Sequence, residues 1–140
     1  MSSIARVFID ANVLFSASYQ PRHPFLLFWT STRVQIVTSL YAVDEARRNI
    51  SSESHLDSLN RLLAQTQLIT DYGDGLPEEV SLPPKDRPIF CAAIAARARY
   101  LVTGDRKHFR RYFDQTFDTT SGPLTVIEPA SLLRLLKKSH

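Results

Sequence analysis

The sequence has 140 residues, and its composition is that of an ordinary globular domain. Hydrophobic residues make up 44% of the chain and charged residues 22%, which argues against intrinsic disorder. No apolar run approaches the ~20 residues of a membrane-spanning helix, and the N-terminus lacks the basic segment and apolar core of a signal peptide. The formal charge of +3 permits contact with nucleic acid without requiring it.

The single cysteine, Cys91, bears on the cellular compartment. One cysteine cannot form an internal disulfide, and neither a second cysteine nor a nearby histidine completes a zinc-binding pattern. We therefore expect a single domain over residues 1–140 in the reducing cytoplasm, with no membrane partner.

The first predicted element is a buried strand that ends in polar residues. Residues 4–9 form a mostly apolar run, rich in β-branched and aromatic side chains, that suits a strand covered on both faces of a parallel sheet. Asp10 and Asn12 would then emerge at the carboxyl edge of the sheet, where open α/β folds bind ligands. Taken alone, Asp10 could instead be an ordinary turn or helix-cap residue.

Turn residues and apolar spacing place the next elements. We expect a polar loop over residues 16–23, a core helix opened by Pro24, and a second strand over residues 34–38. Ser39 can cap a helix from Leu40 to about Ser52, whose buried face would hold Leu40, Val43, Ala46 and Ile50.

Glu45 lies away from that apolar face. Periodicity alone makes it a solvated surface glutamate that pairs with Arg48 or Asn49 on the next turn. Its helix starts directly after a strand, however, so its first turns should lie above the edge that holds Asp10.

The second half of the chain continues the alternation of helices and strands. Its expected elements are a helix over residues 55–64, a strand over 67–70, a long loop over 71–85, a helix from Asp86, strands over 100–103 and 124–127, a loop over 114–122, and a closing helix over 129–138. The alternation predicts a three-layer α/β/α domain around a central parallel sheet of about five strands.

Four acidic residues follow strand ends or open helices in this prediction: Asp10, Glu45, Asp86 and Asp105. In a parallel sheet these positions share one edge, so the carboxylates would meet there. Such clustered charges raise one another's pKa unless a cation neutralises them. Hard oxygen ligands select Mg²⁺ or Mn²⁺, which suits phosphodiester hydrolysis. As an alternative, Asp86 could be only a helix cap.

Basic residues flank the same predicted edge: Arg87, Arg97, Arg99, Arg106, Lys107, Arg110 and Arg111. A cationic rim around an anionic centre is typical of a site for a polyanionic substrate. Arg106 and Lys107 directly follow Asp105 and are the main candidates for substrate contact. The alternative is a solvated helix surface.

Three segments carry a specific pattern. Residues 10–14 read DANVL, residues 86–89 read DRPI and open an alanine-rich helix, and residues 100–109 read YLVTGDRKHF. Together they resemble the PIN-domain ribonucleases, and the resemblance extends over essentially the whole chain. By position, the family's acids fall on Asp10, Glu45, Asp86 and Asp105, and its ligand-orienting polar residues fall on Asn12 and Thr103. Asp44 is an alternative to its neighbour Glu45, which is preferred because residues 46–49, ARRN, are similar to the family pattern.

The resemblance implies a PIN-like nuclease domain with a definite activity. Family members are endonucleases of single-stranded RNA that use Mg²⁺ or Mn²⁺, and many bacterial ones are VapC-like toxins held by a small antitoxin. A homodimer is also implied by the family. The chain departs from the pattern at His108, where many members carry another aspartate. This imidazole could ligate metal, bind phosphate as part of the substrate site, or do nothing.

Two alternatives to the nuclease remain open. Because position 108 has a histidine and not an acid, one alternative is an RNA- or protein-binding module with a vestigial site. A phosphotransferase that phosphorylates Asp10 is the other, although such enzymes use a second aspartate two residues on, where this chain has Asn12.

Overall fold

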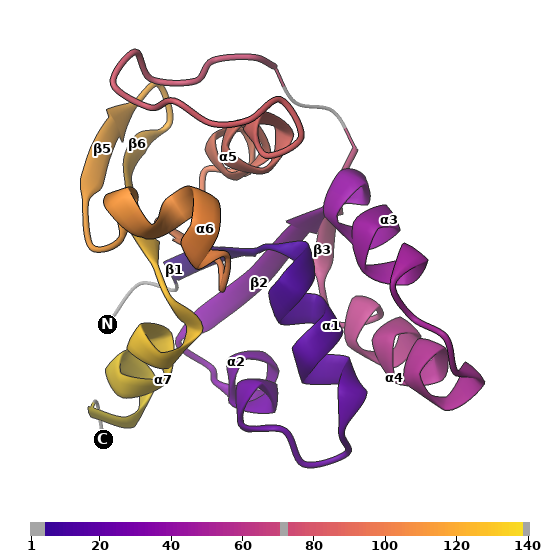
Figure 1. Ribbon diagram of the computed structural model, residues 1–140. Helices are drawn as coiled ribbons and strands as arrows, with labels where there is room; N and C mark the ends of the chain where they lie inside the picture. Colours follow the sequence, from indigo (N-terminus) through magenta and orange to yellow (C-terminus); the bar gives the residue numbers. More distant parts are fainter. Residues whose placement is uncertain (1–4, 71–72, 139–140) are drawn as a thin grey trace.

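The computed structural model describes residues 5–70 and 73–138 (Figure 1). Its centre is a six-stranded sheet with the strand order β3-β2-β1-β4-β6-β5. The strands are β1 (Ala5–Ile9), β2 (Val34–Ser39), β3 (Gln67–Ile69), β4 (Tyr100–Val102), β5 (Thr116–Thr119) and β6 (Gly122–Ile127). All neighbours pair in parallel except β5 and β6, which are antiparallel. The predicted α/β architecture is confirmed.

The helices of the described ranges connect these strands. They are α1 (Ala11–Tyr19), α2 (Leu27–Thr30), α3 (Leu40–Arg48), α4 (Glu53–Leu63), α5 (Arg87–Ala95), α6 (Arg106–Phe109) and α7 (Pro129–Lys138), with 3-10 turns η1 (Pro24–Leu26) and η2 (Arg110–Tyr112). Among the residues that the structure describes, no helix is long and apolar enough to cross a membrane.

Two sequence-based expectations were wrong. The loop expected over residues 16–23 is helical up to Tyr19. Asp10 caps the start of α1, and the helix buries Val13, Leu14 and Ala17. The loop expected over residues 114–122 contains β5, which adds a sixth strand. The polar composition of β5 concealed it, since this edge strand buries a single side chain, Phe117.

The predicted face of α3 also needs correction. Leu40, expected to be buried, is 41% exposed, whereas Ala42 is fully buried beside Val43 and Ala46. Leu40 is the first residue of α3, directly after the capping residue Ser39, whose Oγ accepts the Ala42 N–H at 3.1 Å.

The strands that follow β1 are added to the sheet first on one side of β1 and then on the other. The crossovers from β1 to β2 and from β2 to β3 run one way across the sheet, and those to β4 and β6 run the other way. Because parallel crossovers are right-handed, the two sets of helices cover opposite faces; in Figure 1, α1 and α2 lie on one side and α5 on the other. The carboxyl ends of β1 and β4 therefore flank the topological switch point, where open α/β sheets bind ligands.

The core lies at this same centre. Val7, Phe8 and Ile9 of β1 are completely buried. The long loop before α5 belongs to the core as well, because Val80 and Leu82 are buried within it. Its backbone is held by the hydroxyl of Tyr112, which accepts the Ser81 N–H at 2.7 Å. The loop therefore delivers Asp86 to α5 from a fixed position.

The C-terminus of α5 contains a strained residue. Arg97 has φ of 57°, and the N–H groups of Arg97 and Ala98 bond the carbonyls of Ile94 and Ala93 at 2.9 and 3.1 Å. This Schellman closure places a left-handed residue where glycine is normally favoured. The side chain is exposed, and its Cβ is sterically unfavourable in the left-handed backbone conformation.

Replacing this residue should therefore stabilise the fold. We expect Arg97→Gly to raise the free energy of unfolding by about 0.5–1 kcal/mol, because the left-handed strain is relieved. Thermal unfolding measures the change. Arg97→Ala, which removes the charge but keeps the Cβ, is the control, and a glycine variant no more stable than the alanine variant would contradict the assignment.

Candidate metal centre

A cavity of about 540 Å³ opens at the carboxyl edge of the sheet beside the switch point. Its lining combines residues that follow β1, lie on α3, or adjoin the N-termini of α5 and α6: Asp10, Ala11, Asn12, Phe15, Ser16, Glu45, Asn49, Lys85, Asp86 and Asp105. The structure thus brings all four predicted acids to one cavity.

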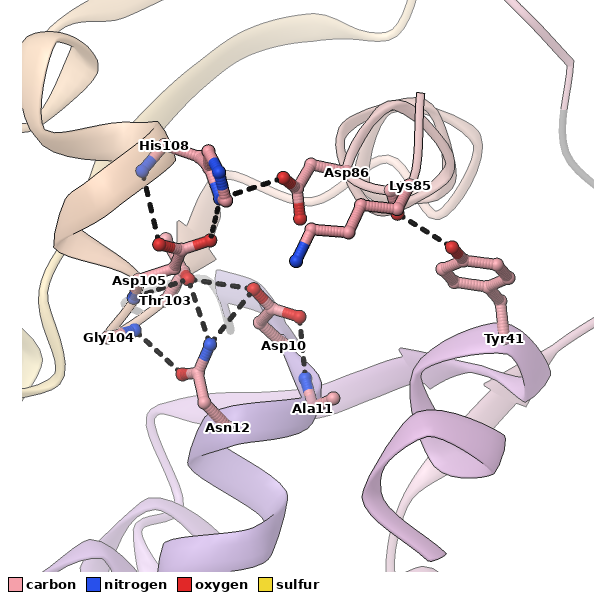
Figure 2. A network of polar contacts seen from close by, with 10 residues as sticks. All are labelled: Asp10, Ala11, Asn12, Tyr41, Lys85, Asp86, Thr103, Gly104, Asp105 and His108. Atoms are coloured by element: carbon pink, nitrogen blue, oxygen red, sulfur yellow. Dashed lines mark hydrogen bonds and ion pairs between the residues drawn. The ribbon is translucent and has the colours of Figure 1, made fainter. Parts of the chain in front are cut away.

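Asp10 is the most deeply buried of these acids, with 5% of its surface exposed. Its Oδ1 accepts the Ala11 N–H at 2.6 Å, and its Oδ2 accepts hydrogen bonds from Thr103 Oγ1 at 2.7 Å and Asn12 Nδ2 at 3.2 Å (Figure 2). The cap that the sequence suggested is therefore present, but it uses one oxygen and leaves the other directed toward Thr103.

Burial raises the pKa of Asp10 to about 6 from the ordinary value of 3.8. The hydrogen bonds from Thr103 and the Ala11 N–H oppose this rise, and the negative charges of Glu45 and Asp86 add to it. A buried carboxylate of this kind is costly to ionise without a nearby cation.

Asn12 and Thr103 tie the ends of β1 and β4 together. Asn12 donates to Asp10 and accepts the Gly104 N–H through Oδ1 at 2.7 Å, while Thr103 Oγ1 also accepts the Asp105 N–H at 3.1 Å. A Cβ at Gly104 would lie 3.2 Å from Asn12 Oδ1, which explains the glycine at this close approach. These contacts fix Asp10 relative to Asp105.

Asp86 opens α5, yet its side chain makes no capping hydrogen bond. The Ile89 and Phe90 N–H groups bond its backbone oxygen instead, so the carboxylate is left for the cavity. It is 7% exposed, and its Oδ2 accepts no hydrogen bond. The pKa of Asp86 is raised by burial; His108 opposes the rise and Asp105 adds to it.

His108 links two of the acids. Its Nδ1 lies 2.9 Å from Asp105 Oδ2 and 3.0 Å from Asp86 Oδ2. Only the contact with Asp105 has hydrogen-bond geometry. Among the described residues, the group of three compatible metal-binding side chains is Asp86, Asp105 and His108, whose ligand atoms all lie within 4.8 Å of one another.

Glu45 reaches the cavity from α3, whereas its neighbour Asp44 is exposed and does not line it. Burial raises the pKa of Glu45, Asp86 raises it further, and Arg48 and Lys85 oppose these effects. The geometry therefore favours Glu45 over Asp44. Glu45 and Asp10 lie outside the tight group around His108, so the four acids surround the cavity unevenly.

The predicted basic rim is only partly present. Arg106 extends into solvent and pairs with Glu128 at 2.8 Å, and with Lys107, His108, Arg110 and Arg111 it lines a second hollow of about 540 Å³ beside α6. Arg97 and Arg99 were wrongly expected at this edge. They precede β4, whereas the cavity lies beyond its carboxyl end, because α5 runs the full height of the sheet between Asp86 and Arg97.

Sequence reasoning missed the basic residue inside the cavity. Lys85 lies next to Asp86, and its side chain extends toward the space between Asp86 and Asp10 (Figure 2). The one signal in the sequence was this adjacency. Asn49 and Phe15 were also missed as cavity residues, the latter because no helix was expected over residues 11–19.

The donor set fits a hard divalent cation. A buried carboxylate oxygen without a hydrogen bond, on Asp86, is the feature that a bound cation would satisfy. Carboxylate oxygens around it suit Mg²⁺ and Mn²⁺, and the imidazole of His108 adds a ligand more typical of transition metals.

Comparison with known proteins identifies the fold family. A family model described as PIN domain matches residues 6–107. The chain belongs to the PIN-domain family. PIN domains are nucleases, so this PIN domain comes from a family of phosphodiester hydrolases. No curated protein matches the sequence.

Solved structures show the same fold. A chain in the crystal structure of VapBC2 from Rickettsia felis, bound to a DNA fragment from its promoter, superposes with a TM-score of 0.59 at 16% sequence identity. The match covers 88% of this PIN domain and 98% of that chain. The similarity confirms the three-layer architecture.

The raised pKa of Asp10 predicts how stability depends on pH without metal. Folding favours the protonated form, so stability from this group falls as the pH rises from the ordinary pKa toward about 6. Between pH 4 and pH 7 the native protein should therefore lose about 2 kcal/mol relative to Asp10→Asn.

Urea unfolding in chelator at a series of pH values measures this difference. The other cavity acids are present in both proteins, so the difference reports Asp10 together with its charge interactions with Glu45 and Asp86. A difference between native protein and Asp10→Asn that does not change with pH would show that Asp10 is not destabilised by burial.

Proposed function

We propose that this PIN domain is an endoribonuclease that hydrolyses phosphodiester bonds of single-stranded RNA with Mg²⁺ or Mn²⁺. The observation that carries the proposal is the cavity in which Asp10, Glu45, Asp86 and Asp105 meet and in which Asp86 Oδ2 has no hydrogen-bond partner. Membership of a nuclease family supplies the reaction class.

The four acids would hold the cation, and their carboxylates differ in the hydrogen bonds that they accept. The orientation of Asp10 is fixed by Thr103 and Asn12, which both donate to its Oδ2. Asp86 Oδ2 accepts no hydrogen bond, although His108 Nδ1 lies 3.0 Å from it. When bound, a divalent cation polarises a phosphoryl oxygen and makes water a better nucleophile.

The residues around the acids would orient the substrate. Arg106, Lys107 and His108 lie on α6 beside the cavity and are proposed to hold RNA phosphates on the approach to it. Hydrolysis adds a water oxygen to phosphorus and breaks one phosphorus–oxygen ester bond, and the departing sugar oxygen takes up a proton. No protein nucleophile is required.

The cellular setting is also a proposal. The structural similarity to a chain of VapBC2 supports a VapC-like toxin whose partner is a small antitoxin protein. We propose that residues 1–140 act as one nuclease domain, in the cytoplasm and as a homodimer, by analogy with the family.

A second candidate function is an RNA- or protein-binding module with an impaired site. The observation that favours it is His108, which bonds Asp105 and contacts Asp86 with the nitrogen that a cation would need. In this case millimolar Mn²⁺ would leave the melting temperature unchanged, whereas a cation bound only by the native state would raise it.

The nuclease proposal predicts metal-dependent cleavage that requires Asp10. Purified protein should cut a labelled single-stranded RNA with Mn²⁺, should not cut it in chelator, and should lose activity by at least a hundredfold on Asp10→Asn, because the amide cannot ligate as an anion. Gel analysis of the labelled products measures this. Cleavage that persists in the variant would reveal a contaminant or a wrong site.

The adjacent acids of α3 give a matched pair. We expect Glu45→Gln to lower the cleavage rate at least tenfold and to weaken Mn²⁺ binding, because a cavity ligand loses its charge. Asp44→Asn removes the same charge one residue away on the exposed side and should leave both quantities unchanged. The reverse pattern would place the second acid at Asp44.

A further inference from the structure

Lys85 is a basic side chain in an otherwise acidic cavity. Of the described residues that line the cavity, four are acidic and Lys85 alone is basic. Lys85 is exposed, and Figure 2 shows its ammonium group extended toward the space between Asp86 and Asp10.

The backbone of Lys85 is held in place. Its carbonyl accepts the Tyr41 hydroxyl at 2.7 Å, which ties it to α3, and the next N–H, of Asp86, bonds the Pro83 carbonyl at 2.9 Å. Two prolines, Pro83 and Pro84, restrict the chain just before it. The side chain therefore starts from a rigid point at the cavity wall.

The ammonium group itself is not committed to a partner. Over the described ranges, 5–70 and 73–138, Lys85 Nζ makes no hydrogen bond or ion pair within the usual distances, although its charge acts on Glu45 and Asp86. Arg106, in contrast, is held by Glu128 at 2.8 Å. A lysine that stays near several carboxylates without pairing keeps its three donors for another acceptor.

The charge balance indicates which acceptor. Four carboxylates against one ammonium leave the cavity strongly negative, and a divalent cation reduces this negative charge without cancelling it. A phosphodiester then adds one negative charge on the open side, where Lys85 extends.

We propose that Lys85 is a substrate-binding residue that donates to a non-bridging oxygen of the RNA phosphate held at the metal centre. This assignment rests on the proposed nuclease function for its catalytic consequence, but phosphate binding by Lys85 can be tested separately. Its flexible stem lets the ammonium follow the phosphate as negative charge builds up on the oxygens during hydrolysis.

The binding experiment uses inactive protein. In an Asp10→Asn background, the affinity for a fluorescent 20-nucleotide single-stranded RNA of mixed sequence is measured by anisotropy with Mn²⁺ over a range of KCl concentrations. Lys85→Met should weaken binding at least fivefold and reduce the slope of log affinity against log salt by about 0.7, the value for one lost phosphate contact on a single strand. Lys137→Met, an exposed lysine on α7, is the matched control.

The cleavage experiment uses the otherwise native protein. Lys85→Met should lower the single-turnover rate by about a hundredfold with Mn²⁺ affinity unchanged or tighter. Methylammonium should restore part of the activity of Lys85→Ala, which a purely structural defect would not allow. Calorimetric titration with Mn²⁺ provides the affinity.

The outcomes separate the two proposals. If native protein does not cleave RNA but Lys85→Met still loses RNA affinity and salt slope, the nuclease function fails and the phosphate contact stands. If Lys85→Met matches Lys137→Met in RNA affinity and salt slope, the assignment is overturned. If only Mn²⁺ affinity changes, Lys85 is a counterion of the acids and the assignment is likewise overturned.

Discussion

The burial of Asp10 at the end of β1 is the constraint on which the site depends. A carboxylate in the centre of the molecule, with its pKa raised to about 6 by burial, would destabilise the fold if its oxygens were unpaired. Thr103 and Asn12 supply partners from the neighbouring strand end and from the first turn of α1. The same contacts hold β1 against β4, so the sheet and the site are stabilised by one network.

Asp105 and Asp86 both precede a helix, but only one of them caps it with its carboxylate. Asp105 uses one oxygen to cap α6 by accepting the His108 N–H at 3.1 Å. Asp86 begins a helix without capping it, and Pro88 in the first turn removes a donor that would otherwise need a partner. The helix therefore starts well without the carboxylate, which remains available in the cavity.

Basic side chains lie near the acids in two separate places. Lys85 reaches it from a rigid loop and makes no ion pair, while Arg106 and its neighbours on α6 stay in a separate hollow. His108 lies between the two regions and contacts Asp86 and Asp105. A polyanion that spans both hollows would place several of its phosphates beside basic side chains and one phosphate beside the acids.

The sequence by itself predicted most of the elements and the four acids that line the cavity, because buried strands and strand-end polar residues follow local patterns. It failed at α1 and β5, where the polar residues of short or edge elements resemble loops. The tertiary structure alone decided which side chains meet. The position of Lys85 at the cavity, of His108 between two acids and of Arg97 at the opposite edge all depend on strand order and helix direction, which bring residues far apart in the chain to one place.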